Sequence, residues 1–329
     1  MNKQRKSTIM GNEISKIAEY RLGGYLQKVM IEGKSKENPI LCFLHGGPAM
    51  PIPFSVGCRG LFPEYTEHFL FVCWDQLGCG INDYIIDDSF TIDSYVDMTV
   101  DLIKELKKEF PANRLFLFGT SWGSILAAKA ANRVPELVDN VLVMGQILKD
   151  LFFNDEVYAA LEMAGLSDKE KKALMECREK STHNTDDLKI IAAMIRKHTQ
   201  GYQATAGGKM PIGKVLRGLL ASPDYSLKNV VAIMKNGFGK NQSIFNELLQ
   251  LDIEDELRRI SVPYRILQGD LDIVTSTNNI VAFVEQNENP NMSFHMLENC
   301  GHMPGAAAME EVLAESIKLV DRPLEELRL

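Results

Sequence analysis

Short runs of apolar residues, each ending at a glycine or a polar turn, recur along the chain. Residues 40–44 end at His-Gly-Gly-Pro, residues 69–74 at Asp-Gln-Leu-Gly, and residues 115–118 at Gly-Thr-Ser-Trp-Gly. Continuous apolar runs of this length are typical of strands that are buried on both faces of a parallel sheet. We predict three further strands from similar runs, over residues 138–144, 263–268 and 293–297.

Helical spacing of apolar residues separates these strands. The clearest case spans residues 92–110 and is closed by Pro111 and Asn113. Alternation of strands with helices predicts an α/β sheet with right-handed crossovers. The start of the chain differs, because apolar and polar residues alternate around Gly23-Gly24 as in a β-hairpin. Further helices are predicted over residues 124–131, 279–286 and 306–320.

The middle of the chain departs from this alternation. Residues 148–257 are richer in charge, helical in character and poor in buried strands, as residues 155–164 and 243–251 illustrate. The simplest architecture is a core of residues 1–147 and 258–329 interrupted by a helical cap. We expect the cap of residues 148–257 to lie over the carboxyl ends of the strands.

Composition narrows the functional classes. The net charge is −8 without a basic stripe, which argues against a nucleic-acid-binding protein. No run of 18 or more apolar residues predicts a membrane span, and no apolar segment follows the basic start as in a secretory signal. The six cysteines form no CxxC pair and match no zinc or disulfide spacing. We therefore expect a cytoplasmic protein without metal, cofactor, membrane partner or nucleic-acid partner.

The pattern Gly-x-Ser-x-Gly at residues 119–123 predicts a nucleophile elbow around Ser121. In such an elbow the serine lies on a strained strand-to-helix turn with its hydroxyl exposed. Side chains two residues to either side would collide, so both flanking positions need glycine. Here the pattern follows a predicted buried strand and opens a helix of small residues. This context favours the elbow over an ordinary turn.

A nucleophilic serine needs a histidine to remove its proton and a carboxylate to orient that histidine. In α/β-hydrolases the chain order is serine, acid, histidine, and His302 follows the last predicted strand in a loop. His295 falls inside that strand, and the other histidines precede the acid. Two aspartates compete for the acid role, and we favour Asp272 because Gly269 makes the turn before it. Asp270 would then brace the loop.

Stabilising a tetrahedral oxyanion takes two hydrogen-bond donors. One is expected from the backbone N–H of Trp122, the residue after the nucleophile. The other is expected from the loop at residues 45–48, where glycines let the backbone approach a substrate. Gly47 is the first candidate and Gly46 the alternative, and His45 is interpreted as a residue that shapes this loop.

Five segments together resemble the prolyl aminopeptidase (proline iminopeptidase) branch of the α/β-hydrolases. The resemblance implies a mostly parallel twisted sheet flanked by helices, with an inserted helical cap. It also implies release of an N-terminal residue, often proline, from small peptides, through an acyl-enzyme and without a metal. The segments are HGGP at 45–48, WDQLGCG at 74–80, GTSWGS at 119–124, QGDLD at 268–272 and CGHMP at 300–304.

The chain departs from the pattern of this branch at three places. Ala49 replaces a glycine, Leu77 replaces an arginine, and residues 81–83 replace the serine that usually closes the second motif. These positions flank the expected site and leave the candidate triad itself intact.

The same resemblance implies that carboxylates of the cap hold the free amine of the peptide substrate. Glu156, Glu162 and Glu247 are candidates for this role, and no local motif selects among them. A hydrolase of small esters or amides, without free-amine recognition, is the alternative function. A non-catalytic α/β-hydrolase scaffold is a third hypothesis, which a broken triad would favour.

Overall fold

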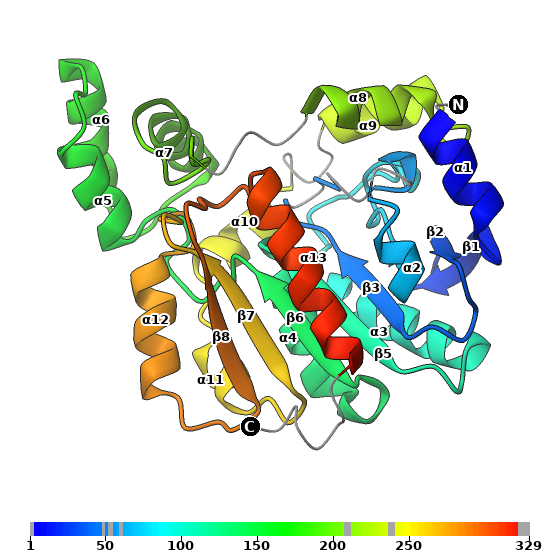
Figure 1. Ribbon diagram of the computed structural model, residues 1–329. Helices are drawn as coiled ribbons and strands as arrows, with labels where there is room; N and C mark the ends of the chain where they lie inside the picture. Colours follow the sequence, from blue (N-terminus) through cyan, green and yellow to red (C-terminus); the bar gives the residue numbers. More distant parts are fainter. Residues whose placement is uncertain are drawn as a thin grey trace.

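The computed structural model describes residues 3–47, 50–51, 55–58, 62–206, 212–235 and 241–321. In this part of the chain the strands form an eight-stranded sheet in the order β1-β2-β4-β3-β5-β6-β7-β8 (Figure 1). All predicted strands are confirmed to within a few residues. The strands are β1 Ile14–Leu22, β2 Tyr25–Gly33, β3 Ile40–Leu44, β4 Leu70–Cys73, β5 Leu115–Thr120, β6 Asn140–Met144, β7 Tyr264–Gly269 and β8 Met292–Leu297.

The two parts of the sheet differ in strand direction. Strands β1 and β2 form the predicted antiparallel hairpin, with Ile14 opposite Gly33 and Leu22 opposite Tyr25. Strand β2 also runs antiparallel to β4, whereas β4, β3, β5, β6, β7 and β8 pair in parallel. Because parallel neighbours need crossover connections, helices link these strands and their carboxyl ends meet at one edge.

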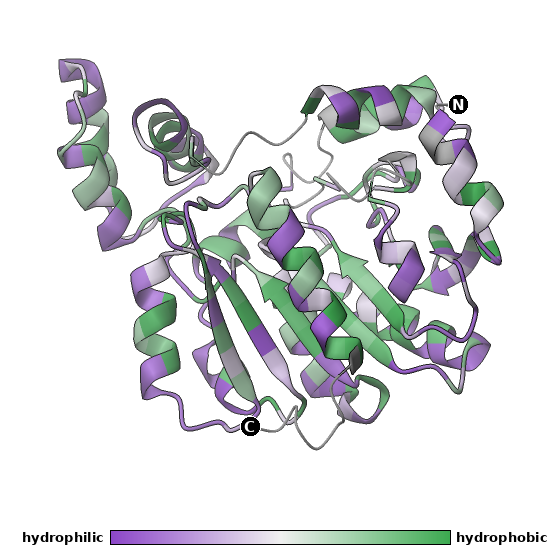
Figure 2. Cartoon of the chain, viewed as in Figure 1, coloured by the Kyte–Doolittle hydropathy of each residue, from purple (hydrophilic) through white to green (hydrophobic). Residues whose placement is uncertain are grey.

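Alternating side chains divide the apolar runs between two cores. In β3, Ile40, Cys42 and Leu44 belong to one hydrophobic cluster, whereas Leu41 and Phe43 belong to the other. Strand β5 alternates in the same way. A central strand such as β3 must therefore be apolar on both of its faces, which explains the continuous runs in the sequence. Figure 2 shows the central strands as mostly hydrophobic and the outer surfaces of the helices as more hydrophilic.

Helices cover both faces of the sheet. In Figure 1, α2 and α13 lie in front of the strands, and α3, α4 and α11 lie behind them. Helix α3 begins at a capping box formed by Thr91 and Ser94. The helices outside the β6–β7 connection are α1 Lys3–Gly11, α2 Tyr65–His68, α3 Ile92–Glu109, α4 Trp122–Arg133, α12 Thr277–Gln286 and α13 Ala306–Asp321, with short 3₁₀ turns at Val56–Cys58 and Pro135–Leu137.

The connection from β6 to β7 contains the helices of the expected cap. Figure 1 shows α5 to α9 beyond the carboxyl ends of the strands, in two groups. Helix α11 instead lies against α4, where Lys129 pairs with Glu256 at 3.0 Å. The division at residues 148–257 stays a prediction. The helices are α5 Asp155–Glu162, α6 Asp168–Arg178, α7 Thr185–His198, α8 Ile212–Ala221, α9 Leu227–Lys235, α10 Gln242–Leu249 and α11 Glu254–Arg258.

Within the described residues, every helix is too short or too polar to cross a bilayer.

Candidate active site

Ser121 lies at the sharp junction between β5 and α4. Its backbone has φ 48° and ψ −117°, a strained conformation for a residue other than glycine. The neighbouring glycines leave the room that this turn needs. A Cβ on Gly123 would overlap the carbonyl oxygen of Leu44, and a Cβ on Gly119 would lie 2.5 Å from the carbonyl oxygen of Gly123. The physical requirement for glycine on both sides of the serine is therefore met.

The structure brings the three residues of the candidate triad together. His302 lies in the loop after β8, and its Nε2 is 3.0 Å from Ser121 Oγ. Asp272 lies in the loop after β7, and its Oδ2 is 2.9 Å from His302 Nδ1. The Asp272 side chain is only 1% exposed and that of His302 10% exposed. The three side chains form a continuous line from a buried carboxylate to a partly exposed hydroxyl.

Four hydrogen bonds fix the Asp272 carboxylate. Oδ1 accepts from the N–H groups of Val274 at 2.9 Å and Thr275 at 3.2 Å. Oδ2 accepts from the Thr275 hydroxyl at 2.8 Å, in addition to its bond with the histidine. The competing Asp270 accepts instead from the N–H of Cys300 at 2.9 Å and braces the histidine loop. The geometry thus places Asp272, rather than Asp270, against the histidine.

The histidine loop is held by the segment after α7, which sequence reasoning missed. The N–H of His302 donates to the Gly201 carbonyl at 3.0 Å, and the N–H of Met303 donates to the Tyr202 carbonyl at 2.7 Å. On the other side lies Gly145, whose φ is 63° and where a Cβ would lie 3.4 Å from two atoms of the His302 ring. In the sequence, this position could have been found from the glycine that directly follows the predicted strand at residues 138–144.

The loop after β3 lies against the nucleophile. A Cβ built on Gly46 would be 3.4 Å from the Cβ of Ser121. Gly47 is exposed and has φ 128°, a conformation that favours glycine. Pro48 of the predicted motif falls outside the described residues. The structure therefore brings Gly46, Gly47 and the first residue of α4, Trp122, to the same edge of the sheet.

His45 is a buried neutral residue that shapes this loop. Burial lowers the pKa of His45 to about 4. Its Nε2 accepts from the N–H of Gln76 at 3.0 Å, so Nδ1 carries the proton and donates to the Gly46 carbonyl at 2.8 Å. The imidazole thus fixes the peptide group that joins Gly46 to Gly47.

The three candidate amine anchors have other partners. Glu156 accepts hydrogen bonds at 2.5 and 3.0 Å from two groups at the N-terminus of α12. Glu162 is exposed and forms an ion pair with Arg178. Glu247 accepts from the first amide of α3 at 2.8 Å. Within the described residues, no hydrogen bond links these glutamates to the candidate triad, and their role in binding an amine stays a prediction.

A buried carboxyl connects the β6–β7 insertion to the loop after β4. Asp75 accepts from the N–H groups of Val56 at 3.2 Å and Ile81 at 3.0 Å. It also accepts from the hydroxyl of Tyr225, which lies between α8 and α9. Burial raises the pKa of Asp75 to about 7, because the surroundings disfavour its charged form more than the hydrogen bonds favour it.

This raised pKa predicts a pH-dependent contribution to stability. The unfolded chain releases the Asp75 proton near pH 4, whereas the folded protein retains it to about pH 7. Folding is therefore favoured by this group at low pH, and its contribution is lost as the pH rises from about 4 to about 7. Asp75→Asn should remove that dependence, so its free energy of unfolding should rise relative to that of the wild type as the pH rises. Urea unfolding of both proteins between pH 5 and 8 measures this change, and a difference that stays constant with pH would contradict it.

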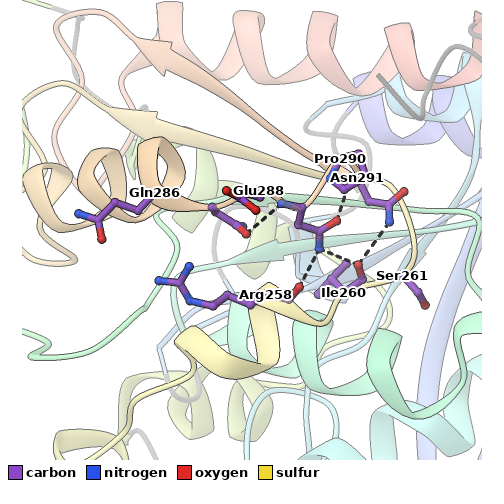
Figure 3. Close-up of a pocket in the computed structure, with 9 residues that line it drawn as sticks. Arg258, Ile260, Ser261, Gln286, Glu288, Pro290 and Asn291 are labelled. Carbon is purple, nitrogen blue, oxygen red and sulfur yellow. Dashed lines mark hydrogen bonds between the residues drawn. The ribbon is translucent and has the colours of Figure 1, made fainter.

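A hollow at the opposite edge of the sheet provides no comparable chemistry. It lies at the amino ends of β7 and β8, and Figure 3 shows the polar side chains that line it. Asn289 Nδ2 donates to the carbonyls of Arg258 at 3.2 Å and Ile260 at 2.7 Å. Asn291 also donates to the Ile260 carbonyl, at 3.4 Å. These amides brace the local loops rather than face a ligand.

Among the described residues, no three His, Cys, Asp or Glu side chains cluster in an arrangement that could hold a metal ion.

Comparison with known proteins finds similarity in sequence to one fold family and to individual proteins. A family model described as the alpha/beta hydrolase fold matches residues 39–163. The chain is 25% identical to the probable aminopeptidase YbaC of Bacillus subtilis, over 88% of this chain and 92% of that protein. It is 23% identical to a proline iminopeptidase of Heyndrickxia coagulans, over 82% of this chain and 86% of that protein.

A solved structure agrees in architecture. The crystal structure of proline iminopeptidase from Mycobacterium smegmatis superposes with a TM-score of 0.63. The match covers 95% of this chain and 99% of that one, with 18% sequence identity. At this identity the likeness concerns the fold.

Proposed function

The chain has the α/β-hydrolase fold and resembles proline iminopeptidases, and from this premise we propose that it is a serine hydrolase that releases N-terminal residues from small peptides. The observation that carries the proposal is the line Ser121–His302–Asp272, with separations of 3.0 and 2.9 Å. Nucleophilic catalysis needs this arrangement of hydroxyl, base and orienting carboxylate. The reaction requires no metal and no cofactor.

The geometry supports an acyl-enzyme mechanism. Ser121 Oγ attacks the substrate carbonyl while His302 Nε2 removes its proton. The tetrahedral intermediate collapses, and His302 returns the proton to the leaving amine. Water then attacks the ester formed on Ser121, with His302 again as the base, and the free serine is regenerated. Asp272 keeps the proton of the neutral histidine on Nδ1, so that Nε2 faces the serine.

Two backbone N–H groups are proposed to bind the oxyanion. One belongs to Trp122, the first residue of α4, where the positive end of the helix dipole also favours negative charge. The other belongs to Gly47, with Gly46 as the alternative. The closeness of Gly46 to Ser121, where an added Cβ would lie 3.4 Å from the serine Cβ, supports this assignment, because it brings the glycine loop next to the reacting atom.

One observation favours the alternative function. Peptide trimming from the N-terminus calls for a carboxylate that binds the free amine, and Glu156, Glu162 and Glu247 each have other partners. A hydrolase of small esters or amides would need no such group. The same triad and oxyanion groups serve either substrate, since the fold alone does not determine it.

Substrate preference separates the two functions. Turnover of proline, alanine and leucine nitroanilides should be measured beside acetyl and butyryl nitrophenyl esters, with Ser121→Ala as the blank. If the free-amine anilides are preferred and N-acetylation abolishes their cleavage, the protein is an aminopeptidase. If the esters are preferred and N-acetylation has no effect, it is a hydrolase of small acyl groups.

We also propose a cytoplasmic location. Its support is the state of four cysteines, which are buried and free in the structure and behave as small apolar side chains. They are Cys42, Cys79, Cys177 and Cys300.

A further inference from the structure

Gln76 connects two segments of the candidate site that are distant in sequence. Its side chain is fully buried. The indole Nε1–H of Trp122 donates to Gln76 Oε1 at 2.9 Å, and Gln76 Nε2–H donates to the His45 carbonyl at 3.2 Å. The backbone N–H of Gln76 donates to His45 Nε2 at 3.0 Å. One residue thus contacts both the start of α4 and the loop after β3.

Each of these two segments contains a proposed oxyanion donor. Trp122 offers its own backbone N–H. On the other side, the His45 ring holds the Gly46 carbonyl at 2.8 Å. That carbonyl shares a peptide group with the N–H of Gly47, and in a trans peptide the two point in opposite directions. Fixing the Gly46 oxygen therefore also fixes the direction of the Gly47 N–H.

We propose that Gln76 is a positioning residue of the oxyanion hole, which sets the separation and orientation of the Trp122 and Gly47 N–H groups. This inference rests on the proposed serine hydrolase function. Both donors must lie about 2.7–3.1 Å from the developing oxyanion, so small displacements of either segment reduce transition-state stabilisation. Substrate binding depends far less on this spacing.

The chain contains a matched control for this role. Gln27, also fully buried, accepts from the indole Nε1–H of Trp74 at 2.9 Å and donates to the Leu22 carbonyl at 3.1 Å. The arrangement of indole, carboxamide and carbonyl is the same as at Gln76. Gln27 also donates to Met98 Sδ at 3.4 Å, and none of its partners belongs to a segment that offers an oxyanion donor. Loss of Gln27 therefore reports the structural cost of losing such a bridge.

The test compares Gln76→Met with Gln27→Met in the full-length protein. Methionine keeps the length of the side chain and removes the hydrogen bonds that the carboxamide of either glutamine makes. Both variants should lower Tm, because each removes buried hydrogen bonds to an indole N–H and to a backbone carbonyl. Gln76→Met should lower kcat by about 10- to 100-fold with KM nearly unchanged, whereas Gln27→Met should keep kcat within about twofold. Each rate is divided by the concentration of active sites, measured by labelling with a fluorophosphonate. Misfolded protein is therefore excluded from kcat.

The outcomes separate this inference from the proposed function. If wild-type Ser121 is labelled and Ser121→Ala is inactive, but the two methionine variants lose kcat equally or not at all, the role of Gln76 is wrong. If Ser121→Ala remains fully active, the proposed function itself fails. Should Gln76→Met not fold, Gln76→Glu keeps an acceptor for the indole and loses only the donor to His45, and its kcat should still fall at unchanged KM.

Discussion

Replacing Ser121 with alanine should lower kcat by about 10⁴-fold or more on whichever substrate the protein prefers. Without Oγ no acyl-enzyme can form, and His302 loses the proton that it is placed to remove. The remaining oxyanion groups and substrate contacts sustain only a small residual rate. Alanine meets the same backbone strain at φ 48° as serine does, so Tm should change little. Steady-state kinetics and thermal unfolding of the same preparation measure both quantities.

Ser124 is the matched control for this substitution. It lies three residues along the same chain, is fully buried, and accepts from the N–H of Ile147 at 3.1 Å through its hydroxyl. Ser124→Ala should lower Tm, because the buried N–H of Ile147 loses its hydrogen-bond partner. Its kcat should stay within a fewfold of the wild-type value, as expected for a small change in packing. Full turnover by Ser121→Ala would show that another residue is the nucleophile.

Most of the fold could be predicted because its signals are local. The strands are continuous apolar runs, since both faces of the sheet are covered, and glycines and prolines mark their ends. Helix α1, Lys3–Gly11, was missed because it is mostly polar and lacks an apolar face with helical spacing. The connection from β6 to β7 was predicted to be helical. The bounds of its individual helices could not be predicted, because they depend on how the helices pack against one another.

The candidate triad could be located because each member follows a strand in a short motif with its own glycine. The supporting groups could not be found in this way. Gly201 holds the histidine loop through a backbone carbonyl, which carries no residue signature. Gln76 acts through partners 31 and 46 residues away along the chain. The orientation of Glu247 is likewise set by its contact with the N-terminus of α3, not by its own helix.

Asp272→Asn should lower kcat by about 10⁴-fold while the protein remains folded. The reason lies in the partners of the two carboxylate oxygens. Oδ1 accepts from the backbone N–H groups of Val274 and Thr275, so an asparagine would keep its amide oxygen at that position. Its NH₂ group would then replace Oδ2 and face His302 Nδ1. The imidazole would have to accept there and carry its proton on Nε2, where it could no longer remove the proton of Ser121.

Asp270→Asn provides the comparison within the same loop. The Asp270 carboxylate is exposed and accepts from the N–H of Cys300, and an asparagine oxygen can accept that bond equally well. Its kcat should therefore stay within a fewfold of the wild-type value, since the substitution leaves the tautomer of the His302 imidazole unchanged. Steady-state kinetics on both variants, with Tm as the check on folding, distinguish the two aspartates. An equal loss of kcat in both would mean that the loop's conformation, rather than the hydrogen bond from His302 to Asp272, limits catalysis.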